Sequence, residues 1–313
     1  LEANFALRQC VGDANFVTGI NDAAQVLIDL ARQILEKTPA RTPALREMEE
    51  ADAVFVLGED VTQTAPRVAL ALRQAVKNKG LQLAAENKIS HWQAAGVKDV
   101  AQTEKSPLFI ASFADTRLDD VAEQCCKAPA DDMARLGFAV AHILDTEAPA
   151  VEGLTQEEQV LAERIAAALL AAKKPLLVSG TGCGSVAVIE AAANIALALH
   201  KKGVSAGLAF CLPEVNSLGL AMLGGASLDA GLKALSSGEA DAVVIVENDI
   251  FRRAETSSAE LALSHAKVVV TIDHQQTPTV SKSHFVLPAA SFAEGDGTMI
   301  SMEARAQRYF QVY

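Results

Sequence analysis

Two short apolar runs, each opening with Ala-Asp-Ala-Val and closing with acidic residues, constrain the fold of this chain more than any other feature. They are ADAVFVLGEDV at residues 51–61 and ADAVVIVENDI at residues 240–250. An apolar run of this length is typical of a strand buried on both faces of a parallel sheet. Because helical sequence flanks both runs, their similarity favours two related α/β domains.

The rest of the chain alternates between the same two kinds of segment. Apolar residues at helical spacing predict helices that include 22–35, 64–80, 117–126, 157–172 and 185–203. Short apolar runs predict further strands at 107–113, 174–180, 266–273 and 284–288. Alternation of this kind specifies parallel sheets covered by helices. The predicted fold class is therefore α/β, with two doubly wound parallel-sheet domains related by internal duplication.

One stretch has the character of a linker between the two domains. Residues 145–155, DTEAPAVEGLT, mix Pro, Gly and acids with little periodicity. We therefore predict a first domain at residues 1–150 and a second at residues 151–313.

Composition and charge exclude several classes of partner. Half of the 313 residues are hydrophobic, but charged positions interrupt every long apolar stretch. No uninterrupted apolar run approaches the length that crosses a bilayer. The net charge of −12 disfavours binding to phosphate backbones and anionic membranes. We expect no nucleic-acid partner and no direct insertion into a membrane.

The residues that commonly bind metals or act as nucleophiles do not form a recognisable set. None of the five cysteines belongs to a C-x-x-C pair, and adjacent Cys125 and Cys126 would point in different directions on the predicted helix. The six histidines are scattered, and neither a nucleophile elbow nor an H-E-x-x-H motif is present. We predict reduced thiols, no metal site and no catalytic residue.

Candidate binding residues lie in the loops that follow the predicted strands, because open α/β sheets bind ligands beyond the carboxyl ends of their strands. Gly58 and Asp60 follow the first repeat, and Asn248 follows the second. Asp273 ends the strand predicted at residues 266–273.

A glycine-rich loop, SGTGCGS at residues 179–185, is the best candidate for an anion site. Gly180, Gly182 and Gly184 could let backbone N–H groups approach an anion at the start of the following helix. The loop lacks both the complete dinucleotide fingerprint and the Lys-Ser/Thr ending of a Walker A motif. A tight strand-to-helix turn is therefore the alternative reading of the same glycines.

Gly297 and Thr298 lie in SFAEGDGTMISMEARAQRYF, residues 291–310, where small residues stand beside carboxylates. Such a stretch could hold a metal, cradle a phosphate or make a turn. With the preceding HFVLPAA it resembles the signature of the molybdopterin oxidoreductase superfamily, and the matched positions are Leu287, Pro288, Glu294, Gly297, Thr298, Glu303, Arg305 and Gln307. The ending EARAQRYFQVY, together with KKPLLVSGTG and NSLGLAMLGG, is similar to the large iron–sulfur subunits of bacterial respiratory complex I, the NADH:quinone oxidoreductases.

The resemblance implies two domains that hold a bis-pterin guanine dinucleotide cofactor, but several residues depart from the family pattern. Glu59, Asp60 and Asp249 add carboxylates where the pyrophosphate would approach, and Ala304 replaces a glycine. We therefore expect a scaffold without a molybdenum cofactor, in which Gly58, Asp60, Gly180, Gly182, Asn248, Asp273, Gly297 and Thr298 are vestigial binding residues. A retained nucleotide- or pterin-binding module is the alternative.

The resemblance also implies a function and partners. It implies a structural role in electron transfer from NADH to quinone, beside the other subunits of the peripheral arm, in the cytoplasm against the bacterial inner membrane. It places the iron–sulfur clusters in an amino-terminal part of the subunit, and this chain opens without Met in sequence of helical character, as a fragment of a longer polypeptide would. We expect the fragment alone to be inactive. KPLLVSGTG also resembles the central domain of thiamine-diphosphate enzymes, but no partner motif for the diphosphate accompanies it.

Overall fold

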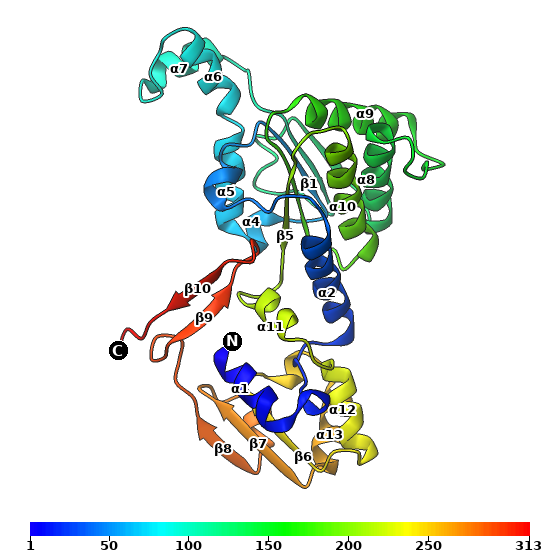
Figure 1. Ribbon diagram of the computed structural model, residues 1–313, viewed down its shortest axis with the longest axis vertical. Helices are drawn as coiled ribbons and strands as arrows, with labels where there is room; N and C mark the ends of the chain where they lie inside the picture. The colour runs from blue at the N-terminus through cyan, green and yellow to red at the C-terminus, as the bar shows by residue number, and fades with distance from the viewer. The chain divides into compact units, whose positions relative to one another are not determined.

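The computed structural model describes residues 1–313, which form two compact units (Figure 1). The larger unit is continuous and comprises Leu30–Pro213. The smaller unit combines Leu1–Asp29 with Glu214–Tyr313. Each unit contains its own parallel sheet, as the predicted fold class requires.

The larger unit is built on a five-stranded sheet with the order β3-β2-β1-β4-β5. Its strands are β1 (Ala53–Leu57), β2 (Leu108–Ser112), β3 (Gln124–Lys127), β4 (Pro175–Gly180) and β5 (Gly207–Cys211). All neighbours pair in parallel, with Val54 opposite Leu108 on one side of β1 and Ala53 opposite Pro175 on the other. Every residue of β1, β2 and β4 is buried, which explains why these strands are apolar throughout.

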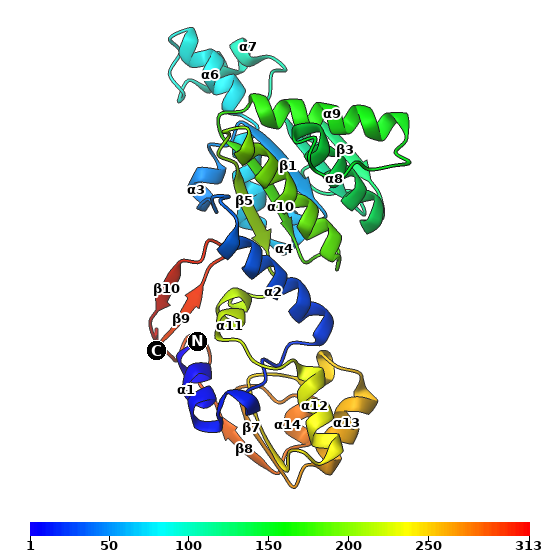
Figure 2. The same cartoon turned by 45° about the vertical axis from the view of Figure 1, so that its right-hand side comes forward.

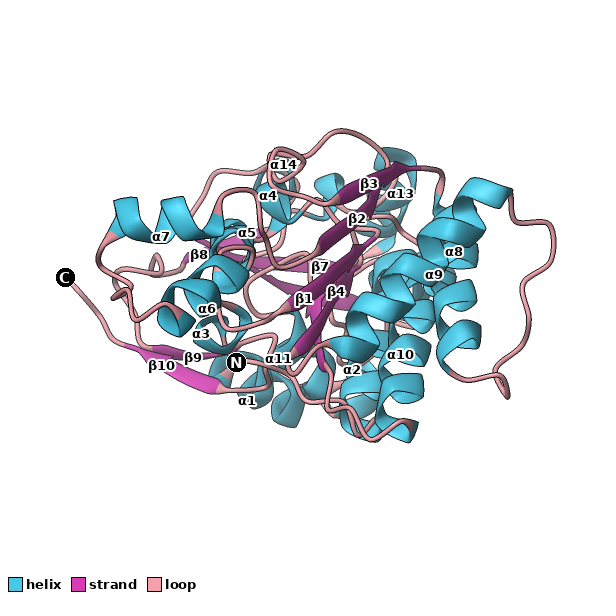
Figure 3. Cartoon of the chain, turned by 90° about the horizontal axis from the view of Figure 1, so that it is seen from above, coloured by secondary structure: helices cyan, strands magenta, loops and turns pink.

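Helices cover both faces of this sheet (Figure 3). On one face α8 (Ala130–Leu144) packs against α9 (Gln156–Ala171) and α10 (Val186–Lys201). The opposite face carries α5 (Pro66–Ala75), whose core-facing residues include Val68 and Leu72. The other helices with residues in this unit are α2 (Asp22–Lys37), α3 (Leu45–Met48), α4 (Val61–Thr64), α6 (Asn78–Glu86) and α7 (Ala94–Ala101).

The smaller unit contains a three-stranded parallel sheet with the order β6-β7-β8. Its strands are β6 (Ala242–Val246), β7 (Val268–Asp273) and β8 (Phe285–Pro288), and a separate antiparallel hairpin joins β9 (Gly297–Ile300) to β10 (Ala306–Tyr309). Its helical segments are α1 (Glu2–Val11), η1 (Asp13–Asn15), α11 (Ser217–Leu223), α12 (Leu228–Ser237), η2 (Ile250–Arg252), α13 (Thr256–His265) and α14 (Pro278–Ser281).

One face of the small sheet is covered by α12 and α13 (Figure 2). Leu232 and Leu235 of α12 and Leu263 of α13 form a core with Ile245 of β6 and Val269 of β7. Side chains alternate along each strand, so Val244, Phe285 and Leu287 point away from that core. These three side chains remain 49%, 61% and 52% exposed.

The domain boundary predicted after residue 150 does not lie there. Residues 145–155 connect α8 to α9 within the larger unit. The reason is sheet pairing, because β4 and β5 follow that loop and yet extend the sheet from β1. The two repeats nevertheless form β1 in the larger unit and β6 in the smaller one.

Most predicted strands are confirmed, but some local predictions were wrong. Residues 117–126, predicted as a helix, form turns followed by β3, which places Cys125 and Cys126 on opposite faces of a strand. Pairing with the edge of β2 selects this conformation. Gly80 lies within α6 and does not end a helix. The strands β5, β9 and β10 were not predicted.

Candidate functional site

The candidate site of the larger unit lies where the direction of strand addition reverses. The sheet grows from β1 through β2 to β3 on one side and from β4 to β5 on the other. Because β1 and β4 are parallel neighbours, the loops that follow them meet at the carboxyl edge between the two halves. This switch point is the usual ligand crevice of a doubly wound fold.

The side chain of Glu59 occupies the glycine-rich turn at this point. The backbone N–H of Gly182 donates to Glu59 Oε1 over 2.5 Å. The hydroxyl of Thr64 donates to Glu59 Oε2 over 3.1 Å. Only 2% of Glu59 is exposed. The chain therefore supplies its own carboxylate to the turn that was predicted as an anion site.

The glycines of the turn leave the space that this carboxylate fills. A Cβ added to Gly182 would lie 2.7 Å from Glu59 Oε2. A Cβ added to Gly180 would collide with Glu59 Oε1 and also with the backbone carbonyl oxygen of Cys211. Both glycines are thus required by contacts within the protein, and no external ligand is needed to explain them.

Gly58 has a local role at the end of β1. Its φ is +77°, a conformation that favours glycine, and an added Cβ would lie 2.6 Å from Val188 Cγ1 of α10. The positive φ redirects the chain immediately before Glu59. Gly58 therefore helps to place Glu59 in the turn.

Asp60 acts as the N-cap of α4. Its Oδ1 accepts from the backbone N–H of Thr62 over 3.0 Å and from the Thr62 hydroxyl over 2.5 Å. A capping aspartate satisfies helix N–H groups that would otherwise lack partners. The structure thus assigns Asp60 to local stabilisation of the loop after β1.

Burial shapes the electrostatics of the turn. Desolvation raises the pKa of Glu59, although the hydrogen bonds from Gly182 and Thr64 act in the opposite direction. Burial, with the nearby Glu59 carboxylate, also raises the pKa of the Cys211 thiol to about 12. The pKa of Cys183 is raised for the same two reasons, with burial again the larger. Neither thiol is poised to act as a thiolate nucleophile at neutral pH.

The raised pKa of Glu59 predicts a pH-dependent difference between the wild type and Glu59→Gln. A carboxyl group whose pKa is higher in the folded state stabilises that state most below its unfolded pKa, roughly 4.3. That contribution is lost as pH rises through the folded pKa. The free energy of unfolding of wild type minus that of Glu59→Gln should therefore fall from pH 4 towards pH 7.

Urea denaturation at four pH values across this interval would measure the difference. Glu190→Gln, on the exposed side of α10, is the matched control. A difference that rises with pH for Glu59→Gln would contradict the prediction.

The candidates Asn248 and Asp273 lie in the smaller unit, after β6 and at the end of β7. Asn248 Nδ2 donates to the carbonyl of Gly19 over 3.1 Å, and Asn248 Oδ1 is buried without a hydrogen-bond partner. Asp273 is buried, and its Oδ1 accepts from the backbone N–H of Gln275 over 2.9 Å. His274 Nδ1 lies 3.6 Å from the carboxylates of Asp273 and Glu247.

Asp273 lines a polar pocket of about 330 Å³ in the smaller unit. Its acidic lining residues are Glu214, Glu247, Asp249 and Asp273, and its basic ones are Arg252 and Arg253. Arg253 is already paired with Glu214, at 2.5 Å. Asp249 Oδ1 accepts from the hydroxyl of Thr279 over 2.7 Å. The carboxylates outnumber the arginines, so the pocket does not resemble a phosphate site.

The candidates Gly297 and Thr298 belong to the β9–β10 hairpin. Thr298 donates to the carboxylate of Glu2 from its N–H over 3.1 Å and from its hydroxyl over 2.5 Å. A Cβ on Gly297 would collide with the ring of Tyr309. Glu294 accepts from the N–H and hydroxyl of Ser291. In this structure the signature stretch is a folded turn and hairpin held by local and intra-unit contacts.

The structure brings four of the eight candidates together. Gly58, Asp60, Gly180 and Gly182 surround the loops after β1 and β4, whereas Asn248, Asp273, Gly297 and Thr298 belong to the smaller unit. Glu59 and Thr64 were not among the predicted site residues. The change to Glu at position 59 was noticed as a source of charge repulsion, and the structure shows that its carboxylate is instead hydrogen-bonded within the turn.

Two further observations bear on the chemistry. No group of three or more His, Cys, Asp or Glu side chains is arranged to hold a metal ion. None of the helices combines the length and apolar character that a bilayer crossing requires.

Comparison with known proteins identifies the family. The profile of the molybdopterin oxidoreductase family matches residues 148–313. The chain belongs to the molybdopterin oxidoreductase family. It is also similar, over all 313 residues, to the NADH-quinone oxidoreductase subunits that are designated by the letter G, with 54% identity to the Pseudomonas fluorescens protein and 51% to that of Escherichia coli K12. The chain spans 35% and 34% of the length of these relatives.

Solved structures agree with membership of the molybdopterin oxidoreductase family at the level of fold. One chain of the formyltransferase/hydrolase complex from Methylorubrum extorquens superposes with a TM-score of 0.57 and 13% identity, over 92% of this chain and 77% of the other. Acetylene hydratase from Pelobacter acetylenicus gives a TM-score of 0.55 and 12% identity, over 91% of this chain and 47% of the other. At such identities the likeness establishes the shared fold alone.

Proposed function

We propose that this chain is a cofactor-less, structural part of the large iron–sulfur subunit of NADH:quinone oxidoreductase. Support comes from identities of 51–54% to NADH-quinone oxidoreductase subunits over the whole chain. In this proposal the chain contributes architecture to the peripheral arm of the complex, and electrons pass through clusters held by another part of the polypeptide. Its partners are the other subunits of that arm, at the cytoplasmic side of the bacterial inner membrane.

The observation that carries the absence of a pterin cofactor is the position of Glu59. A pyrophosphate-bearing cofactor needs N–H donors and positive charge at a glycine-rich turn. Here the Gly182 N–H already donates to a buried carboxylate. A second anion at the same place would face charge repulsion and would have to displace that hydrogen bond. The residues of this turn therefore do not fit the cofactor.

The strand ends of the smaller unit support the same proposal. Glu247, Asp249 and Asp273 surround one polar pocket, and Glu247 adopts a φ of +47°. Such a concentration of carboxylates disfavours an anionic dinucleotide. The geometry suits a folded, self-contained scaffold better than a binding site.

Cofactor analysis of the intact complex that contains this chain would test the proposal. Molybdenum measured by inductively coupled plasma mass spectrometry and pterin measured by oxidative fluorescence should both fall far below one per chain. Iron measured on the same sample checks that the complex is intact. One molybdenum or one pterin per chain would overturn the proposal.

The alternative function, a retained nucleotide-binding module, predicts a different result. Calorimetry of the intact complex with guanine and adenine nucleotides, in the absence of NADH, would show micromolar binding that Glu247→Ala or Gly182→Val alters. The occupied glycine turn leads us to expect no such binding.

A further inference from the structure

The sheet of the smaller unit ends where its repeat counterpart continues. Aligning the two Ala-Asp-Ala-Val segments matches β6 with β1. β1 lies between β2 and β4, whereas β6 is an edge strand with β7 as its single neighbour. Val54 pairs with Leu108 of β2, and its counterpart Val243 pairs with Val269 of β7. The side of β1 that holds β4 therefore corresponds to the open side of β6.

Backbone directions confirm this correspondence. Gly58 donates its N–H to Ala111 over 2.9 Å, and the counterpart Glu247 donates to Ile272 over 2.8 Å. Backbone groups of alternate residues in a parallel strand point to opposite neighbours. The N–H and C=O groups of Ala242, Val244 and Val246 therefore point to the open edge, where no strand pairs with them. An open edge of this kind is a template for another strand.

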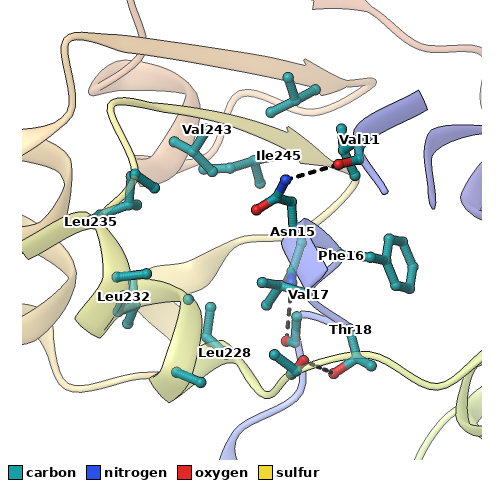
Figure 4. Close-up of a pocket in the computed structure, with 18 of the residues that line it drawn as sticks. Val11, Asn15, Phe16, Val17, Thr18, Leu228, Leu232, Leu235, Val243 and Ile245 are labelled. Carbon is teal, nitrogen blue, oxygen red and sulfur yellow. Dashed lines mark hydrogen bonds between the residues drawn. The ribbon is translucent and has the colours of Figure 1, made fainter. Parts of the chain in front are cut away.

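A largely apolar groove of about 750 Å³ runs along this edge (Figure 4). One wall is formed by Leu228, Leu232 and Leu235 of α12. The residues that complete the lining on the amino-terminal side are Asn4, Leu7, Val11, Ala14, Asn15, Phe16, Val17, Thr18 and Gly19. Asn248, whose buried Oδ1 has no partner, also lines the groove. The groove thus offers apolar walls, a row of free backbone groups and an unsatisfied acceptor.

We propose that this groove receives a parallel β-strand from the stretch of the same polypeptide that precedes Leu1. The relatives are almost three times as long as this chain, so other segments of the polypeptide are available. The preceding stretch is favoured because α1 begins at Glu2 and its side chains Asn4, Leu7 and Val11 line the groove. A strand followed by α1 would repeat the order in which β4 is followed by α10 in the larger unit.

The occupant should therefore resemble β4. It is about five residues long, apolar on both faces, and joined to α1 by a short loop. Its backbone would complete the hydrogen bonds of Ala242, Val244 and Val246. This inference concerns a different surface from the glycine turn, so it holds whether or not the turn binds a cofactor.

Hydrogen exchange and cross-linking on the full-length polypeptide test the proposal. The amides of Val244 and Val246 should exchange as slowly as those of their counterparts Phe55 and Leu57, and at least about 100-fold more slowly than exposed edge amides. A photo-cross-linking residue in place of the exposed Glu239, which lines the groove, should capture a peptide from before Leu1. Rapid exchange, or capture of a second copy or another protein, would overturn the proposal.

A proline variant provides an independent readout. In the full-length polypeptide, Val244→Pro should lower the melting temperature by roughly 6–12 °C relative to Val244→Ala, because proline removes a paired N–H. Proline is tolerated at an N–H that faces an open edge. Equal melting temperatures for the two variants would therefore count against a strand in the groove.

Discussion

Replacing Gly180 with alanine is expected to lower the free energy of unfolding by about 3 kcal/mol. The added methyl group would collide with the backbone carbonyl of Cys211 in β5 and with the carboxylate of Glu59. The carbonyl belongs to a buried strand and cannot move away without disturbing the pairing of β4 with β5. Urea denaturation followed by far-ultraviolet circular dichroism would measure the loss.

The same turn offers a variant whose effect should be reversible. An added Cβ at Gly182 meets only the end of the Glu59 side chain, at 2.7–2.9 Å. Gly182→Ala should therefore cost about 1 kcal/mol, and most of that loss should vanish when Glu59→Ala is already present. Gly180→Ala should keep most of its cost in the Glu59→Ala background.

Additive losses for Gly182 and Glu59 would show that the carboxylate does not occupy the turn. Gly295→Ala serves as the control for glycine replacement itself. Its added methyl would meet nothing closer than 3.9 Å, and we expect a change within about 0.5 kcal/mol.

Phe55→Ala should destabilise the chain by about 3–5 kcal/mol. Phe55 lies at the centre of β1, in the middle of the five-stranded sheet, and is 1% exposed. Its removal would leave a cavity that the surrounding strands and helices can fill only in part, because both faces of the sheet are packed. Urea denaturation would measure this change as well.

The second repeat supplies a matched control for Phe55. Val244 occupies the equivalent position in β6, but its side chain is 49% exposed. In the 313-residue chain, Val244→Ala should change the free energy of unfolding by only about 0.5 kcal/mol. A loss at Val244 as large as that at Phe55 would mean that the outer face of the small sheet is covered in this chain.

Local sequence predicted elements whose burial is continuous, and it failed where distant pairing decides. The run from Ala53 to Leu57 is apolar because both faces of β1 are packed, and this is visible without a structure. Gln124–Lys127 forms β3 because it extends the edge of β2, and a four-residue strand with partly exposed side chains carries no such signal. The boundary failed for the same reason, since the pairing of β4 with β1 crosses the linker-like loop.

The candidate site was predicted in location more than in content. The loops after β1 and β4 contain the switch point, as the rule for open sheets requires. The role of Glu59 could not be read from its neighbours, because its partner Gly182 lies in a loop from another strand. The departure from the family pattern at position 59 was the one available signal, and its sign was judged without knowing where the side chain lies.

The carboxylate in the glycine turn also sets a threshold for any soluble anion. Glu59 is joined to β1 through a single glycine, so it competes as an intramolecular ligand whose effective concentration is at least of order millimolar. A phosphate or nucleotide present at micromolar levels would have to bind the turn far more tightly than a carboxylate does. Loss of a cofactor in this lineage would thus be maintained by one side chain that keeps the vacated turn folded and closed to replacements.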